Sequence, residues 1–185
     1  MEYKSDRLTF REYNKGDFPL LYSIFSNEQI MKYAYMDKVG KEEDLLPYFK
    51  RILQNNNTPE GRTSYEFGVF FYHRAGNFIG FADVEIVKQN QDGGNGEIGY
   101  FFAAGLFGGQ GFATEIVNML LKVCFEEMNL HRVFARCNAN NTNSEKVMIK
   151  AGMAKEGRFR KVRYKNGRWD DELQYSILDE DWRRQ

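Results

Sequence analysis

Hydrophobic residues recur with two periods along the chain, and these periods predict its strands and helices. Alternation of apolar and polar residues, with many aromatic and β-branched side chains, predicts strands. Apolar residues spaced three and four positions apart predict amphipathic helices. The expected strands cover residues 7–11, 65–72, 78–87, 97–102, 132–138, 158–164 and 171–178, and the expected helices cover residues 17–25, 27–35, 41–55, 113–128 and 144–151.

Signals at the element boundaries refine this picture. Pro47 lies inside the pattern of the third helix, and we expect that helix to begin near Leu46 because proline removes a helical hydrogen bond. The polar composition of residues 88–95 predicts a mobile loop between two strands. The Asn166-Gly167 pair predicts a tight hairpin turn near the C-terminus.

The order of these elements predicts a mixed α/β fold with helices on both faces of a sheet. A long helix connects the strands at 97–102 and 132–138, and such a crossover indicates that the two strands are parallel neighbours. No repeat, linker or low-complexity tract interrupts the pattern. We therefore expect a single domain over residues 1–185.

Composition narrows the classes of function. Hydrophobic residues make up 42% of the chain and charged residues 28%, as in an ordinary globular protein. The formal net charge is zero, which argues against direct nucleic-acid binding because that role requires a broad positive field. No apolar run approaches the ~20 residues that cross a bilayer, and the first residues lack a hydrophobic signal core. We expect a cytoplasmic protein that does not bind membranes.

The cysteines and histidines suggest neither a disulfide nor a metal site. Cys124 lies on the apolar face of the central helix and Cys137 in an apolar strand, which are positions typical of buried thiols. His73 and His131 are far apart in sequence and share no metal-ligand spacing. We expect no metal.

A glycine-rich segment before the central helix is the strongest chemical signal in the chain. It contains Gly108, Gly109 and Gly111. Glycine lets the backbone approach a ligand closely, and the first N–H groups of a helix lack intrahelical partners. With the helix dipole, these donors favour a bound phosphate or pyrophosphate. The alternative is a simple tight turn, but three glycines in four positions favour an anion site.

Two common nucleotide motifs fit this segment poorly. The phosphate-binding loop of nucleotide hydrolases ends in Gly-Lys-Ser/Thr, and no lysine follows these glycines. The dinucleotide fingerprint requires a third glycine where this chain has Thr114. An NAD-type oxidoreductase is therefore disfavoured.

The segment instead resembles the acyl-CoA loop of the GNAT superfamily of N-acetyltransferases, whose pattern is Gln/Arg-x-x-Gly-x-Gly/Ala. Gly111 and Ala113 match the last two marked positions, while Gly108 stands where the family usually has Gln or Arg. Residues 109–115 are closer still to the branch containing ribosomal-protein N-terminal and spermidine acetyltransferases. The resemblance extends in ordered motifs over residues 7–178.

A second motif of that branch follows the strand at 132–138. Asn141 and Ser144 match its Asn-x-x-Ser, which in the family contacts the pantetheine arm or the thioester end of the cofactor. Taken alone, the same residues predict a helix N-cap, because their side-chain oxygens accept from unpartnered N–H groups. Lys150-Ala151-Gly152-Met153 resembles the family's Lys-x-Gly-Phe, with Met153 in place of Phe.

The resemblance implies a fold and an activity. The fold is a mostly antiparallel twisted sheet whose two central parallel strands splay apart to admit acetyl-CoA. The activity is transfer of an acetyl group from acetyl-CoA to a primary amine by direct attack in a ternary complex. The implied acceptor is a protein N-terminus, such as that of a ribosomal protein, or alternatively a small amine or polyamine. A non-catalytic acyl-CoA-binding module is the other alternative, and either a monomer or a homodimer is expected.

The resemblance also implies the site residues. Glu97 is expected to be the general base, acting through water, with Asp83 and Glu85 as rivals; solvated acidic residues without a role are the alternative. Ser144 is expected to assist the leaving thiolate, because Met148 stands where many members have a tyrosine. The expected cofactor-binding residues are Phe101, Phe102, Ala103, Gly109, Gln110, Gly111, Phe112, Ala113, Thr114, Asn141 and Ser144.

Overall fold

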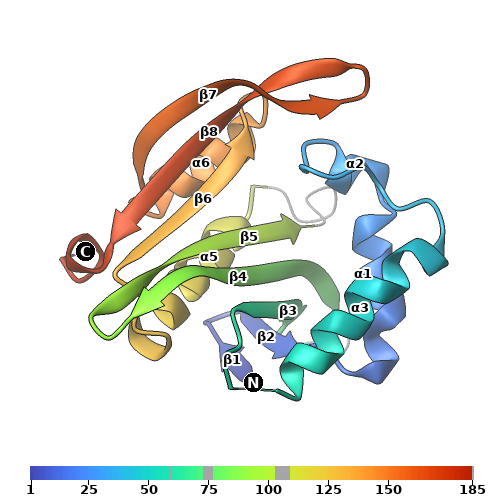
Figure 1. Cartoon of the computed structure of the whole chain (residues 1–185), viewed down its shortest axis with the longest axis horizontal. Helices are drawn as coiled ribbons and strands as arrows, with labels where there is room; N and C mark the ends of the chain where they lie inside the picture. Colours follow the sequence, from blue (N-terminus) through green and yellow to red (C-terminus); the bar gives the residue numbers. More distant parts are fainter. Residues whose placement is uncertain (59, 73–76, 103–108, 185) are drawn as a thin grey trace.

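A single eight-stranded sheet runs through the molecule, in the order β1-β2-β3-β4-β5-β6-β8-β7 (Figure 1). The computed structural model describes residues 1–58, 60–72, 77–102 and 109–184. Neighbouring strands are antiparallel except β5 and β6, which are parallel. The strands are β1 (Glu2–Lys4), β2 (Leu8–Glu12), β3 (Ser64–Phe71), β4 (Phe78–Asn90), β5 (Gly93–Phe102), β6 (Arg132–Asn138), β7 (Ala154–Lys165) and β8 (Arg168–Leu178).

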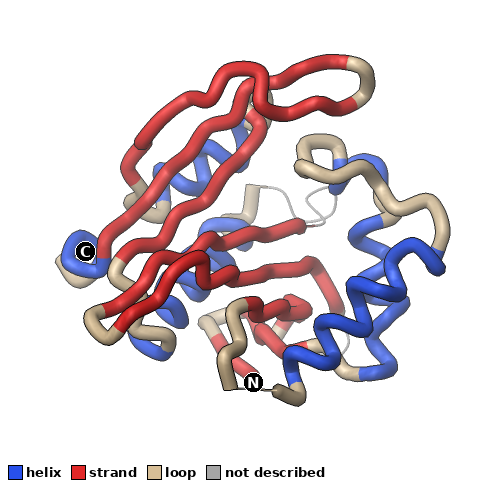
Figure 2. The backbone as a smooth tube through the Cα atoms, viewed as in Figure 1, coloured by secondary structure: helices blue, strands red, loops and turns tan. Residues whose placement is uncertain are grey.

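Helices lie on both faces of the sheet, as predicted (Figures 1 and 2). On one side are α1 (Phe18–Phe25), which a short 3₁₀ turn (Lys15–Asp17) precedes, α2 (Glu28–Met31) and α3 (Glu42–Asn56). On the other side are α5 (Phe112–Lys122), which continues as a π-helical turn (Val123–Glu127), and α6 (Thr142–Lys150). A last short helix, α7 (Asp179–Trp182), follows β8.

Each face of the sheet carries its own cluster of buried side chains. Ile116 and Leu120, at helical spacing on α5, belong to the same cluster as Val133 of β6. On the opposite face, Leu21 of α1 belongs to a second cluster with Phe81 of β4. The amphipathic patterns therefore bury the faces that the sequence predicts.

Helix α3 begins at Glu42, so the prediction that it begins near Leu46 is wrong. Pro47 lies inside the helix and removes only the hydrogen bond that its own N–H would donate. Phe49 and Ile52 are buried against the sheet. Such tertiary packing is the main source of helix stability, and it outweighs the loss of one hydrogen bond.

The predicted mobile loop at 88–95 is also wrong. Strand β4 continues to Asn90, strand β5 begins at Gly93, and these two residues pair across a tight hairpin. Gly93 has φ +129°, and a Cβ on Gly94 would lie 2.6 Å from the Lys88 carbonyl oxygen. The polar composition therefore reflects exposure of the hairpin, and the glycines permit the close approach of its strands.

The parallel strands β5 and β6 pair only where residues Asn95 to Glu97 meet Arg132 to Phe134, and they diverge beyond that point (Figure 1). This confirms the splayed pair that the sequence analysis expected. The C-terminal half of β5 keeps its pairing with β4 on one side and has no pairing with β6 on the other.

The β7–β8 hairpin confirms the predicted turn and arches toward α2 (Figure 1). Asn166 and Gly167 have φ +50° and +76°, the left-handed values that a two-residue turn of this kind requires. At its tip, the Lys165 ammonium donates to the carbonyl oxygens of Met31 (2.6 Å), Ala34 (3.2 Å) and Met36 (2.7 Å). The hairpin is thereby anchored to the segment that follows α2.

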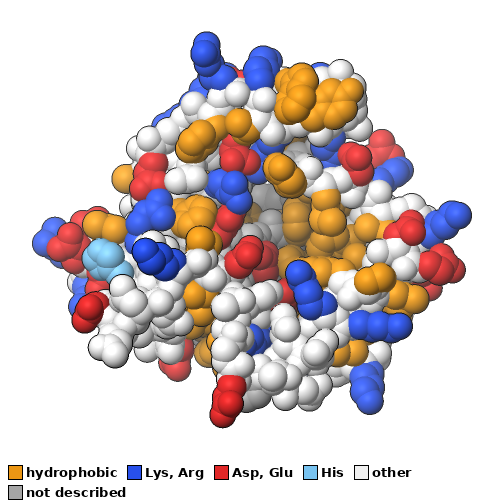
Figure 3. Space-filling model, in the orientation of Figure 1, with side chains coloured by type: hydrophobic (Ala, Val, Ile, Leu, Met, Phe, Trp, Pro, Cys, Tyr) orange, Lys and Arg blue, Asp and Glu red, His pale blue; other side chains and the backbone are white. Residues whose placement is uncertain are grey.

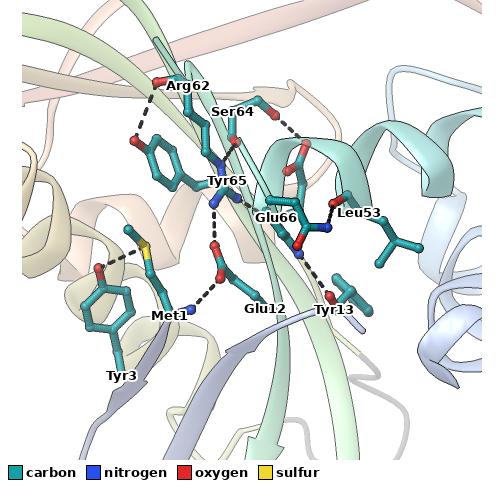
Figure 4. A network of polar contacts seen from close by, with 11 residues as sticks. Met1, Tyr3, Glu12, Tyr13, Leu53, Arg62, Ser64, Tyr65 and Glu66 are labelled. Carbon is teal, nitrogen blue, oxygen red and sulfur yellow. Dashed lines mark hydrogen bonds and ion pairs between the residues drawn. The ribbon is translucent and has the colours of Figure 1, made fainter. Parts of the chain in front are cut away.

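A polar network around Arg62 ties the N-terminal strands to β3 (Figure 4). The guanidinium is 4% exposed, forms an ion pair with Glu12, and donates to the Ser64 carbonyl at 2.7 Å. It also lies 4.2 Å from the centre of the Tyr65 ring. The network holds β2 and β3 together at the base of the sheet.

Both cysteines are buried free thiols, as predicted. Burial raises the pKa of Cys137 to about 11 and that of Cys124 further, so neither forms a thiolate readily at neutral pH. Among the helices described, none has the length and apolar character needed to cross a bilayer.

Candidate active site

A cleft of about 600 Å³ opens where β5 and β6 separate. It lies on the face that carries α1 and α3, and Figure 3 shows it as a hollow bordered by hydrophobic side chains. Strands β4 and β5 form its floor, β6 and α6 one wall, and α1 with the segment after α2 the other. The cleft therefore gathers residues from elements far apart in sequence.

Three carboxylates and one glycine form two cross-strand pairs on the cleft floor. Glu85 of β4 lies opposite Glu97 of β5, and Asp83 lies opposite Gly99. Residues two apart on a strand point to the same face, so all three carboxylates face the cleft. A Cβ on Gly99 would lie 2.4 Å from Asp83 Oδ1, which means that glycine at this position leaves the space for the Asp83 carboxylate.

Glu97 is held by a bidentate ion pair. Arg136 of β6 donates to its two oxygens at 2.8 and 2.7 Å. Arg136 also lies 3.5 Å from Glu172, which in turn accepts from Arg163 at 2.6 Å. Opposite charges thus alternate along this side of the cleft, and the Glu97 carboxylate has both oxygens occupied.

Asp83 differs from Glu97 in its surroundings. Within the described part of the chain, its carboxylate makes no hydrogen bond or ion pair with another side chain. Burial, followed by the negative charges of Glu66, Glu97 and Glu85, raises its pKa to about 7. A carboxylate with this pKa is partly ionised at neutral pH and exchanges a proton readily there.

Ser144 lies across the gap between β5 and β6, where it meets Tyr100. The two hydroxyl oxygens are 2.9 Å apart. Burial raises the pKa of Tyr100 to about 12, so its hydroxyl remains protonated and able to donate. Asn141 Oδ1 accepts from the Ser144 N–H at 3.2 Å, which confirms the predicted N-cap of α6.

The tyrosine hydroxyl is a feature that the sequence analysis missed. Met148, at the position where many family members have tyrosine, is 0% exposed and packs in the core behind the sheet. Tyr100 belongs to β5 and supplies a phenol in the cleft from a different element. Strand alternation alone does not reveal this role, because it depends on which residue of α6 faces β5.

The glycine loop has the backbone shape expected of an anion site. Gly109 and Gly111 have φ +79° and +81°, in the left-handed region that side chains disfavour. Helix α5 starts at Phe112, and no described side chain caps its first turn. The N-terminal end of a helix favours a bound anion, so the loop fits the pyrophosphate of acyl-CoA.

Arg7, which the sequence analysis did not identify, braces this loop from the residue before β2. Its guanidinium donates to Glu115 Oε2 at 2.6 Å and to the Gln110 carbonyl at 3.0 Å. It also lies 4.1 Å from the centre of the Phe112 ring. Ser5 and the Arg7 backbone N–H both donate to the other oxygen of Glu115, at 2.7 and 2.9 Å.

The residues expected at the site fall into three groups. Those that line the cleft are Glu97, Phe101, Phe102, Ala113, Asn141 and Ser144. Those at the start of α5, outside the cleft lining, are Gly109, Gln110, Gly111, Phe112 and Thr114. Ala103 lies outside the described residues. Among the residues described, no group of three potential metal ligands occurs.

Comparison with known proteins agrees with this geometry. The sequence model of the acetyltransferase (GNAT) domain matches residues 7–154. A Bacillus subtilis (strain 168) protein, the uncharacterized N-acetyltransferase YnaD, is 33% identical over 183 residues, which cover 98% of this chain and 99% of that protein.

Two solved structures of acetyltransferases have folds similar to that of this chain. The acetyltransferase (GNAT family) from Bacillus anthracis has a TM-score of 0.76 at 31% identity, covering 97% of this chain and 99% of its own. Spermidine N-acetyltransferase from Vibrio cholerae, in complex with CoA and spermine, has a TM-score of 0.81 at 21% identity, covering 96% and 99%. With its family match, splayed strands and glycine loop, the chain belongs to the GNAT family and is an N-acetyltransferase that uses acetyl-CoA.

Proposed function

We propose that this enzyme acetylates a primary amine and that Asp83 is its general base. The observation that carries the proposal is a carboxylate with a pKa of about 7 and no side-chain partner among the described residues, on the cleft floor beside the strand gap. An amine is protonated at neutral pH and must lose a proton before it attacks a thioester. A base with a pKa near the working pH is suited to accept that proton.

This assignment favours Asp83 over Glu97, the base expected from the family resemblance. Both oxygens of Glu97 accept hydrogen bonds from Arg136, so neither oxygen is left unpaired for an incoming amine. In this proposal Glu97 orients Arg136, and Asp83 receives the proton from the ammonium. Glu97 is the alternative base.

The remaining steps use groups on the two sides of the gap. When bound, acetyl-CoA supplies the activated thioester, and the first N–H groups of α5 would hold its pyrophosphate. The amine nitrogen forms the new C–N bond as the C–S bond breaks. The hydroxyl pair of Tyr100 and Ser144 then donates a hydrogen bond or proton toward the leaving sulfur. Ser144 keeps its expected role, with Tyr100 as the adjoining donor.

The test is release of CoA thiol from acetyl-CoA with a broad panel of amines and N-terminal peptides. We expect kcat/KM for the amine to rise with pH through an apparent pKa near 7, because only ionised Asp83 accepts a proton. Asp83→Asn should lower kcat by roughly 10²–10⁴-fold. The binding of acetyl-CoA, measured by thermal shift, should be unchanged in this variant.

Glu97→Gln is the comparison that decides the base. We expect a smaller loss of kcat than in Asp83→Asn, with the pH profile kept. If the pH dependence of kcat/KM disappears in Glu97→Gln and persists in Asp83→Asn, the base is Glu97. Tight binding of acetyl-CoA without turnover of any amine would instead support the alternative of a non-catalytic acyl-CoA-binding module.

A further inference from the structure

Among the described residues, the end of the cleft beyond Asp83 is lined by aromatic side chains and includes no acid. Phe81 and Phe101 form the next cross-strand pair on the floor, with their ring centres 5.9 Å apart. Phe25 of α1 packs 5.4 and 5.6 Å from these rings, and Tyr48 of α3 lies 5.7 Å from Phe25. These rings line the cleft and leave Asp83 at the border between an apolar end and a charged end.

Charged side chains occupy the opposite end of the cleft. The described acids in the lining are Asp83, Glu85 and Glu97, and Glu97 is bound to Arg136. A second ammonium on the same substrate would lie either near Glu85 or among the aromatic rings, where the described lining has no carboxylate. The aromatic end therefore offers a second charge no carboxylate partner and suits an aromatic group better.

The segment after α2 covers part of the cleft. Tyr33 and Tyr35 line the cleft from this segment, and the Arg163 guanidinium lies 5.2 Å from the Tyr35 ring centre. The three hydrogen bonds from Lys165 hold the same segment against the hairpin. Lys165 and Arg163 thus hold this segment at two points. A segment fixed in this way suits a small flat molecule better than the N-terminus of a folded protein.

We propose that the acceptor is a primary monoamine with an aromatic body, bound with its ammonium at Asp83 and its ring among the aromatic side chains. The inference rests on the proposed function and names the substrate class of the same site. Aromatic faces attract cations, and rings pack against rings in stacked or edge-on geometry. The carboxylate supplies the opposite charge and, after binding, the proton acceptor.

The experiment compares kcat/KM for 2-phenylethylamine, butylamine, spermidine and a short N-terminal peptide, each with saturating acetyl-CoA. We expect kcat/KM for 2-phenylethylamine to exceed that for each of the other three amines by about tenfold or more, a degree of discrimination that hydrophobic pockets reach. A preference for spermidine or the peptide would overturn the inference and leave the proposed function standing. Equal values for 2-phenylethylamine and butylamine would also overturn it.

A matched pair of variants tests the aromatic wall directly. Tyr33→Leu removes a ring from the cleft lining, and we expect the preference for 2-phenylethylamine over butylamine to fall severalfold. Tyr164→Leu makes the same change on the hairpin, outside the lining, and should leave that preference unchanged. An equal effect of both substitutions would contradict the proposed binding mode.

A binding measurement separates this inference from the question of catalysis. If no amine is acetylated, the proposed function fails. Calorimetric titration of 2-phenylethylamine and butylamine into the protein saturated with CoA then still decides the substrate class. We expect the aromatic amine to bind about tenfold more tightly, and equal affinities would overturn the inference.

Discussion

Glu66 is a buried carboxylate directly opposite Asp83, on the neighbouring strand β3. Its side chain is 1% exposed, it accepts a hydrogen bond from Ser64, and its Oε2 has no partner among the described residues. Cross-strand neighbours point to the same face, with Cβ atoms about 5 Å apart. A second negative charge at this distance disfavours ionisation of Asp83 and contributes to its raised pKa.

This arrangement predicts the effect of Glu66→Gln. Removing the negative charge makes Asp83 easier to ionise, so the lower limb of the pH profile of kcat/KM should move to more acidic pH. The relative activity at pH 6 should therefore rise. The control is Glu85→Gln. Solvent screens the charge of the exposed Glu85, so we expect a smaller displacement of the pH profile. An unchanged profile in Glu66→Gln would contradict the coupling between these carboxylates.

At the scale of single elements, the first turn of α5 contains an acid beside the expected pyrophosphate site. Glu115 is neutralised there by Arg7, which also binds the carbonyl of Gln110. An unpaired carboxylate in this turn would repel a bound phosphate. The contact between Arg7 and α5 therefore keeps the turn suited to an anion while it shapes the loop in front of it.

Arg7→Ala should consequently weaken acetyl-CoA binding. Loss of a charged hydrogen-bonding partner at a half-exposed site should raise the KM for acetyl-CoA about tenfold, with little effect on kcat at saturation. The double variant Arg7→Ala/Glu115→Gln should recover part of the affinity, because it removes the repelling charge as well. A loss that the second substitution does not relieve would indicate a purely structural role for Arg7.

At the scale of the whole molecule, the hairpin joins two segments that are far apart in sequence. Lys165 and Met31 are 134 positions apart, yet the ammonium of one donates to the carbonyl of the other. This contact joins the hairpin to the segment after α2, while α5 lies on the other face of the sheet. The proposed amine site and the expected cofactor site are thus supported by different parts of the fold.

Lys165→Met should separate these two functions. Without its three hydrogen bonds, the segment after α2 loosens, and we expect the KM for the amine to rise severalfold while the KM for acetyl-CoA stays unchanged. Lys161→Met is the control, since that lysine donates to Trp169 within the hairpin. Equal changes in both KM values would show that the hairpin acts on the whole site.

Features that depend on local backbone chemistry were predictable from the sequence. Alternation and helical spacing predicted the sheet with helices on both faces, the crossover helix predicted the parallel pair, and the family resemblance implied that this pair splays apart. The Asn166-Gly167 turn was also predictable, because it requires φ values that few residues adopt. The ordered motifs around the glycine loop and Asn141 indicated the family.

Which acid lacks a side-chain partner among the described residues depends on the arrangement of the strands in space. Asp83 and Glu97 look alike in a strand pattern, but one faces Gly99 and the other meets Arg136 from a strand that comes 39 residues later. The braces at Arg7 and Lys165 likewise join distant segments. Ionisation and positioning depend on charges and burial in space, whereas a local pattern reports only which face of an element is apolar.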